Sequence, residues 1–134
     1  MSTRCMIAKR TKGGYKAVYS HWDGYPTKPG VGWTLRTFYK NPTKIDALLS
    51  KGDISSLREN IGRKHSFDKA SRAGAYSDKI RKMGWTTFYG RDRGERGTSA
   101  RTFKTLSDLR KYARNSWAEY LYVYEKGKWT TYRL

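Results

Sequence analysis

Cysteine, acidic residues and long apolar runs are all scarce in this sequence. Cys5 is the one cysteine among 134 residues, so no intramolecular disulfide can form. It lies between apolar neighbours, and we expect it to be a small core residue rather than a nucleophile. No stretch has the length and apolarity of a secretory signal or a membrane-spanning helix, which predicts an intracellular protein with no membrane partner. Since the chain also lacks repeats and linkers, residues 1–134 are expected to form a single domain.

Basic residues far outnumber acidic ones. The chain has 29 lysines and arginines against 11 acidic residues, a formal net charge of +18. A net charge of about 2–8 already keeps a small domain soluble, so this excess favours an anionic partner. Most of the excess lies in three segments. Residues 1–16 contain five basic and no acidic residues, residues 63–82 contain seven and two, and residues 91–114 contain eight and three. Nucleic acid is the commonest such partner, and an acidic protein, an anionic membrane surface or a nucleotide are the others.

Aliphatic residues are also few, and aromatic residues take their place as core material. The chain has 11 tyrosines, 5 tryptophans and 4 phenylalanines. A mean hydropathy of -0.91 would suggest disorder without these rings. Because each buried ring removes a large area from water, we expect a folded domain with an aromatic core. Rings interleaved with basic residues also suit single-stranded nucleic acid, which binds by stacking and phosphate contacts.

Hairpins are expected at both ends of the chain. Alternating residues over 4–9 and 15–22, with a Gly-containing turn between them, predict the first hairpin. Two similar runs, 119–124 and 128–133, predict a second hairpin around another glycine. Residues 85–89 are rich in threonine and aromatic side chains, which favour a middle strand.

Capping signals mark the expected helices. Asn41 followed by Pro42 predicts a helix that ends near Gly52, because asparagine caps the helix and proline fits its first position. Before it, one more helix is expected from an apolar face made by Val31, Leu35 and Phe38. A capping box at Thr105 predicts a helix to about Trp117. Its apolar face would carry Leu106, Leu109, Ala113 and Trp117, and its basic face Lys104, Arg110, Lys111 and Arg114.

The remaining segments have weaker patterns. Residues 53–68 are expected to form one helical turn and then a loop, and residues 77–83 one or two helical turns. Residues 90–97 are expected to be a charged loop, because they contain three glycines. Together the elements predict an α+β fold, in which the two hairpins and the middle strand form an antiparallel sheet. Two or three helices are expected on one face of that sheet.

The segment 89–96 is the most suggestive binding motif. Arg91, Arg93 and Arg96 can each bind phosphate or carboxylate bidentately, and glycine allows a close approach of the backbone. The alternative interpretation is a solvated loop with weak Arg–Asp pairs. In both cases we expect little contribution to the core, so that Arg91→Ala combined with Arg93→Ala leaves the domain folded.

Both histidines lie in polar clusters, His21 beside Asp23 and His65 near Asp68. If the two clusters met, they could hold a metal ion for phosphodiester cleavage. The sequence has no recognised ligand spacing, so we predict no metal, no cofactor and no catalytic residue, and local hydrogen bonds for the histidines. The candidate ligand-binding residues are Tyr89, Arg91, Arg93, Arg96, His21, Trp22, Tyr25, His65, Arg110 and Arg114.

Four segments carry a resemblance to a known family. They are SHWDGYP at 20–26, LLSKGDISSL at 48–57, KHSFD at 64–68 and YGRDRGE at 89–95, followed by an aromatic EYLYVY hairpin. In this order they resemble a family of small, functionally uncharacterised proteins encoded by bacteriophages. The resemblance implies an accessory protein made inside an infected bacterium. The chain departs from the family pattern by a basic stretch between Asp68 and Tyr89.

Charge and resemblance together give the leading hypothesis. It is a phage accessory protein, for host takeover or anti-defence, acting in the host cytoplasm. Its anionic target is expected to be nucleic acid or a nucleic-acid-containing host complex. The alternatives are an inhibitor of an acidic host protein, a sponge for a nucleotide signal and a metal-dependent nuclease. An enzymatic role is the less favoured interpretation.

Overall fold

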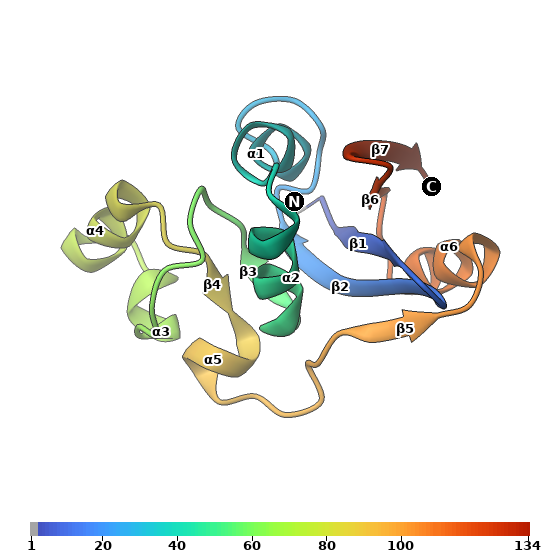
Figure 1. Cartoon of the computed structure of the whole chain (residues 1–134). Helices are drawn as coiled ribbons and strands as arrows, with labels where there is room; N and C mark the ends of the chain where they lie inside the picture. Colours follow the sequence, from blue (N-terminus) through green and yellow to red (C-terminus); the bar gives the residue numbers. More distant parts are fainter. Residues whose placement is uncertain (1–2) are drawn as a thin grey trace.

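The computed structural model describes residues 3–134, which form an α+β domain with seven strands and six helices (Figure 1). The strands are β1 (Cys5–Thr11), β2 (Gly14–Trp22), β3 (Ile54–Ser56), β4 (Thr87–Phe88), β5 (Arg101–Phe103), β6 (Tyr120–Glu125) and β7 (Lys128–Arg133). The helices are α1 (Val31–Phe38), α2 (Pro42–Ser50), α3 (Phe67–Ala70), α4 (Ala75–Met83), α5 (Tyr89–Arg93) and α6 (Leu106–Asn115). No helix within this range is long and apolar enough to cross a membrane.

The sheet is mixed, so the expectation of a purely antiparallel sheet is wrong. The strand order is β4-β3-β2-β1-β6-β7, and β5 pairs with the first half of β2. Both predicted hairpins are present and antiparallel, but β1 is parallel to β6 and β2 is parallel to β3. Parallel neighbours need long crossover connections, and the helical segments between the strands supply them.

Six helices form among the described residues and cover both faces of the sheet, which corrects the expectation of two or three helices on one face. Cys5 and Ile7 pack in the same cluster as residues of α1 and α2, whereas Met6 and Ala8 pack with α6. None of these four side chains has exposed surface. Consecutive apolar residues in a strand indicate that both of its faces are buried, and β1 begins with such a run.

Helices α2 and α6 begin where the capping signals of the sequence predict. In α2, the Asn41 side chain accepts a hydrogen bond of 2.8 Å from the backbone N–H of Thr43, and Gly52 follows the helix with φ of 81°. Helix α1 contains all three residues of the predicted apolar face, but Phe38 at its end is exposed rather than buried. In α6, the Thr105 side chain accepts from the N–H of Asp108, as the capping box predicts.

The middle of the chain differs most from expectation. Residues 54–56 form strand β3 instead of a helical turn, because fully buried Ile54 extends the sheet beside β2. The predicted middle strand is reduced to β4, and the expected loop after it begins with helix α5. Strand β5 is an addition that the sequence pattern did not indicate.

Candidate nucleic-acid interface

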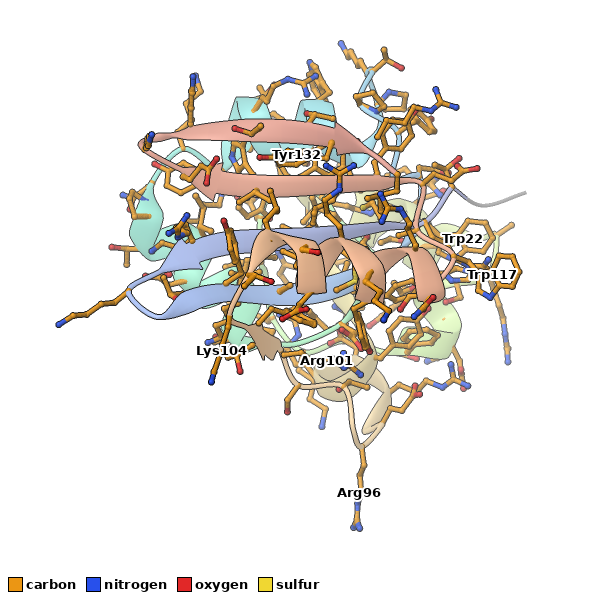
Figure 2. All side chains as sticks on the ribbon, turned by 90° about the vertical axis from the view of Figure 1, so that its right-hand side faces the viewer. Trp22, Arg96, Arg101, Lys104, Trp117 and Tyr132 are labelled. Carbon is orange, nitrogen blue, oxygen red and sulfur yellow. The ribbon has the colours of Figure 1, made fainter. Side chains whose placement is uncertain are left out.

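The outer face of α6 is strongly basic. Leu109 and Ala113 are buried against the sheet, which turns Lys111 and Arg114 to solvent. The same helix carries one carboxylate, Asp108. Figure 2 looks onto this helix. The helical period that buries the apolar residues therefore places the basic residues on the solvent-exposed face of the helix.

Basic residues from the strands join this face. Arg4, just before β1, and Arg10, within it, lie on the same face of the strand as Met6 and Ala8, which pack with α6. The Arg10 guanidinium lies 5.1 Å from the Tyr15 ring centre. We call the following set the α6 surface. It consists of Arg4, Arg10, Arg101, Lys104, Arg110, Lys111 and Arg114.

Aromatic rings hold two further arginines of the α6 surface. The Arg101 guanidinium lies 5.4 Å from the ring centre of Tyr112, and that of Arg110 lies 5.4 Å from the ring centre of Tyr132. Arg101 and Lys104 lie on one side of α6 in Figure 2, and Tyr132 lies on the other. Stacking restricts a guanidinium and leaves its N–H edge free to bind phosphate.

Most of the α6 surface carries no ion pair. Arg101 makes a long contact of 3.4 Å with Asp53. Within residues 3–134, no carboxylate lies within 4.0 Å of the charged atoms of Lys104, Arg110, Lys111 or Arg114. These four cations are therefore available to an external anion.

Two of the three basic segments of the sequence meet at the α6 surface. Residues 1–16 contribute Arg4 and Arg10, and residues 91–114 contribute the other five side chains. The third segment, 63–82, forms α3 and α4 at the opposite end of the molecule (Figure 1). The third segment is thus separate from the α6 surface.

Trp117 is the most exposed aromatic residue at this end of the domain. It follows α6 in a Schellman motif, in which Trp117 N–H donates to the Arg114 carbonyl and Ala118 N–H to the Ala113 carbonyl, each at 3.0 Å. Its φ is 64°, and its side chain is 78% exposed. The prediction that it joins the apolar face of the helix is wrong, because the chain turns before Trp117.

Trp117 and Trp22 lie at the same end of the sheet. The Gly24 N–H bonds to the carbonyl of Thr3 at 2.7 Å, and the Glu119 N–H bonds to the carbonyl of Arg4 at 2.8 Å. The two tryptophans each lie two residues before one of these anchors, and Figure 2 shows both at the same edge of the molecule in that view. Both are exposed, Trp22 by 45%.

His21 joins this end of the α6 surface. Its Nδ1 lies 3.0 Å from the hydroxyl of Tyr19, and its ring meets the Trp22 ring edge-on at 4.8 Å between centres. Burial and the neighbouring Arg4 charge lower the pKa of His21 below its usual value. An anion bound here would raise the pKa of the imidazole.

The predicted 89–96 segment divides into a structural part and an exposed part. The Asp92 side chain is fully buried and accepts from the N–H groups of His65 at 3.0 Å and Phe88 at 2.8 Å, and from Arg91 Nε at 2.9 Å. Arg91 also donates to the carbonyls of Ile61 and Thr86, each at 2.8 Å. The expectation that this arginine contributes little to the core is therefore wrong.

The remaining candidates of that segment are spread over different surroundings. The Tyr89 ring lies 5.4 Å from the ring of Phe67, and the Arg93 guanidinium lies 4.9 Å from the same ring. Arg96 is exposed and projects away from the domain in Figure 2. These side chains do not converge with the α6 surface.

The other predicted residues lie in the loop after β2 and in the core. Tyr25 is half-buried, and its carbonyl accepts from Gly32 N–H at the start of α1. His65 is buried, with its ring nitrogens 2.9 Å from the Arg63 carbonyl and from Thr87 Oγ1. Of the ten predicted site residues, His21, Arg110 and Arg114 lie at the α6 surface, and Trp22 borders it.

The two histidine clusters do not form one site. Within residues 3–134, no three histidine, cysteine, aspartate or glutamate side chains gather closely enough to hold a metal ion. The four-residue arrangement that the nuclease hypothesis needs is therefore not formed there. Cys5 is fully buried, as predicted, and burial raises the pKa of its thiol.

Sequence reasoning missed several residues of this end of the molecule. Arg4 was counted only within its basic segment, and Trp117 was assigned to the core. For Arg4, the alternation over residues 4–9 was a usable signal, because it places Arg4 on one face with Met6 and Ala8.

No protein-family model, curated protein or solved structure matches this chain. A functional assignment therefore depends on the geometry of the α6 surface and on the charge of the chain.

Proposed function

We propose that this protein binds nucleic acid through the α6 surface, by phosphate contacts with little sequence preference. The observation that carries the proposal is the convergence of seven basic side chains from two distant segments, six of them without an ion pair among the described residues. Lysine and arginine that neutralise phosphates release condensed counterions, which drives such binding.

The exposed rings favour a strand with accessible bases over a continuous duplex. Trp117 lies at the end of α6, where a strand that follows the helix would reach it. A ring that is 78% exposed offers a face to an unstacked base, and stacking of this kind tolerates any base. We therefore expect single-stranded nucleic acid to bind more tightly than duplex of the same length.

The biological setting of the proposal follows from the resemblance to bacteriophage proteins. A basic accessory protein in the cytoplasm of an infected host would meet host and phage nucleic acid, free or within a defence complex. Binding either form would serve host takeover or anti-defence. An acidic host protein is the competing partner, because the same basic surface attracts any polyanion.

Fluorescence anisotropy with labelled single-stranded DNA, duplex DNA and single-stranded RNA tests this proposal, using poly-glutamate as a polyanion without bases. One phosphate contact by each of Lys104, Arg110, Lys111 and Arg114 predicts a log–log salt slope of about −3.6 on duplex and about −2.8 on a single strand. Poly-glutamate that binds as tightly as the oligonucleotides would favour the acidic-protein partner. No binding at about 50 mM salt would refute nucleic-acid binding.

A further inference from the structure

A cleft lies at the carboxyl ends of two parallel strands, on the side of the sheet end away from α6. Strands β2 and β3 run side by side, and their final residues Trp22 and Ser56 are paired in register. Two adjoining cavities of about 310 and about 430 Å³ share Trp22, Asp23, Ser56, Arg58 and Arg81 in their walls. Cavities of this size at the carboxyl ends of parallel strands commonly bind small ligands.

Arg58 is held in this cleft with an unsatisfied donor. Its Nε is buried and has no hydrogen-bond partner among residues 3–134, and no carboxylate of that range lies within ion-pair distance of it. Burial, and after it the charge of Arg81, lower the pKa of Arg58, although the carboxylates of Glu59 and Asp23 act in the opposite direction. A buried donor beside a like charge is unfavourable unless a ligand supplies an anionic acceptor.

Arg81 adds a second cation that a ligand can reach. Its Nη1 lies 3.4 Å from Asp78 Oδ1, but both side chains are more than half exposed. Exposed pairs of this kind contribute little, because water and salt screen them. An anion between Arg58 and Arg81 would therefore compete with one weak contact.

The rest of the wall suits a ligand with an aromatic ring and hydroxyl groups. Trp22 exposes 45% of its surface, and its edge-on contact with His21 restricts the ring. Asp23 and Glu59 offer carboxylate oxygens that accept from ribose hydroxyls or from amino groups of a base. A bare phosphate would bind the arginines but would place its negative charge near these two carboxylates, with no ribose or base to donate to them.

We infer that this cleft binds a nucleoside monophosphate, with its phosphate on Arg58 and Arg81 and its base against Trp22. The group can come from a free nucleotide or from the 5′-terminal nucleotide of a strand, since both present the same chemistry. The site lies outside the α6 surface, so the inference stands or falls independently of the proposed function.

Isothermal titration of the full chain with AMP, GMP, CMP and UMP, and with inorganic phosphate, tests the site. At least one nucleotide is expected to bind, and to bind more tightly than phosphate. Arg58→Gln, Arg81→Gln and Trp22→Ala should each weaken it about tenfold. Circular dichroism checks folding, and Arg81 and Trp22 are exposed enough for their variants to fold if Arg58→Gln does not. Absence of binding by all four nucleotides, or binding that Arg81→Gln and Trp22→Ala leave unchanged, overturns a free-nucleotide site.

Oligonucleotides with a 5′-phosphate or a 5′-hydroxyl distinguish the two sources. If the 5′-phosphate form binds more tightly and Arg81→Gln abolishes this difference in affinity, the result supports capture of a strand terminus. Equal binding of the two forms, together with nucleotide binding, supports the free nucleotide. The inference fails if neither nucleotides nor the 5′-phosphate bind. Lys111→Glu combined with Arg114→Glu, on the α6 surface, should leave nucleotide binding unchanged even where it weakens the oligonucleotide.

Discussion

At the scale of single residues, burial separates structural arginines from available ones. Arg91 and Arg110 are both basic residues near aromatic rings, and the sequence does not distinguish them. In the fold, Arg91 donates to Asp92 and to three backbone carbonyls, whereas the Arg110 guanidinium lies against the Tyr132 ring. Two of these carbonyls, of Ile61 and Gly62, belong to a segment about 30 positions away, and local sequence patterns do not indicate that contact.

Asp92 provides the first prediction. Asp92→Asn should lower the free energy of unfolding by about 3 kcal/mol, because an amide accepts on one side only and leaves the N–H of His65 or Phe88 unpaired. Urea denaturation followed by circular dichroism measures the loss. Glu95→Gln, an exposed acid-to-amide change three residues away, is the matched control and should change stability by less than about 0.5 kcal/mol. Equal stability of the two variants would show that the Asp92 hydrogen bonds are dispensable.

His21 should make nucleic-acid binding depend on pH. Burial and Arg4 lower its pKa in the free protein, and bound phosphates would offset Arg4 and raise it. Binding then takes up a proton, so affinity increases as pH falls from the raised pKa of His21 in the complex to its lowered pKa in the free protein. The gain is up to about tenfold for each unit by which the ligand raises the pKa. Anisotropy titrations at several pH values measure it, and His21→Gln should flatten the profile. A profile that this substitution leaves unchanged rules out His21 as the linked group.

At the scale of secondary-structure elements, the sequence predicted what local chemistry determines. Helices α2 and α6 begin as expected, because their caps act within three residues of the helix start. Strands β3 and β5 have three residues each, too few for a recognisable period. They form because β2 offers free backbone groups along its outer edge, a condition that appears only once β1 and β2 are paired.

Trp117 gives a prediction at this scale, since it occupies the position of the Schellman motif that favours glycine. Trp117→Gly should stabilise the domain by up to about 1 kcal/mol by relieving the left-handed backbone strain. It should also weaken single-stranded DNA binding about tenfold through loss of a stacking ring. Trp117→Ala is the matched control, because it removes the ring but keeps the strain. Thermal unfolding and anisotropy separate the two effects. Wild-type affinity in both variants would exclude Trp117 from the interface.

At the scale of the whole molecule, the fold decides what a net charge of +18 can do. The sequence located three basic segments, and it predicted Arg110 and Arg114 as binding residues. It did not reveal which segments meet, because that depends on the pairing of β2 with β5 and of β1 with β6. The result is one basic surface around α6 and a separate basic region on α3 and α4 at the other end (Figure 1).

A pair of charge-reversed variants tests the role of the α6 surface most directly. Lys111→Glu with Arg114→Glu changes α6, and Lys79→Glu with Lys82→Glu makes the same change in net charge on exposed positions of α4. Affinity for single-stranded DNA with a free 5′-hydroxyl is measured by anisotropy over a range of salt. The α6 variant should lose about a hundredfold in affinity and about 1.4 units of salt slope, because two phosphate contacts are removed. The α4 variant should lose far less. Equal losses in the two variants would contradict a defined α6 interface and leave only a general attraction of polyanions to a basic protein.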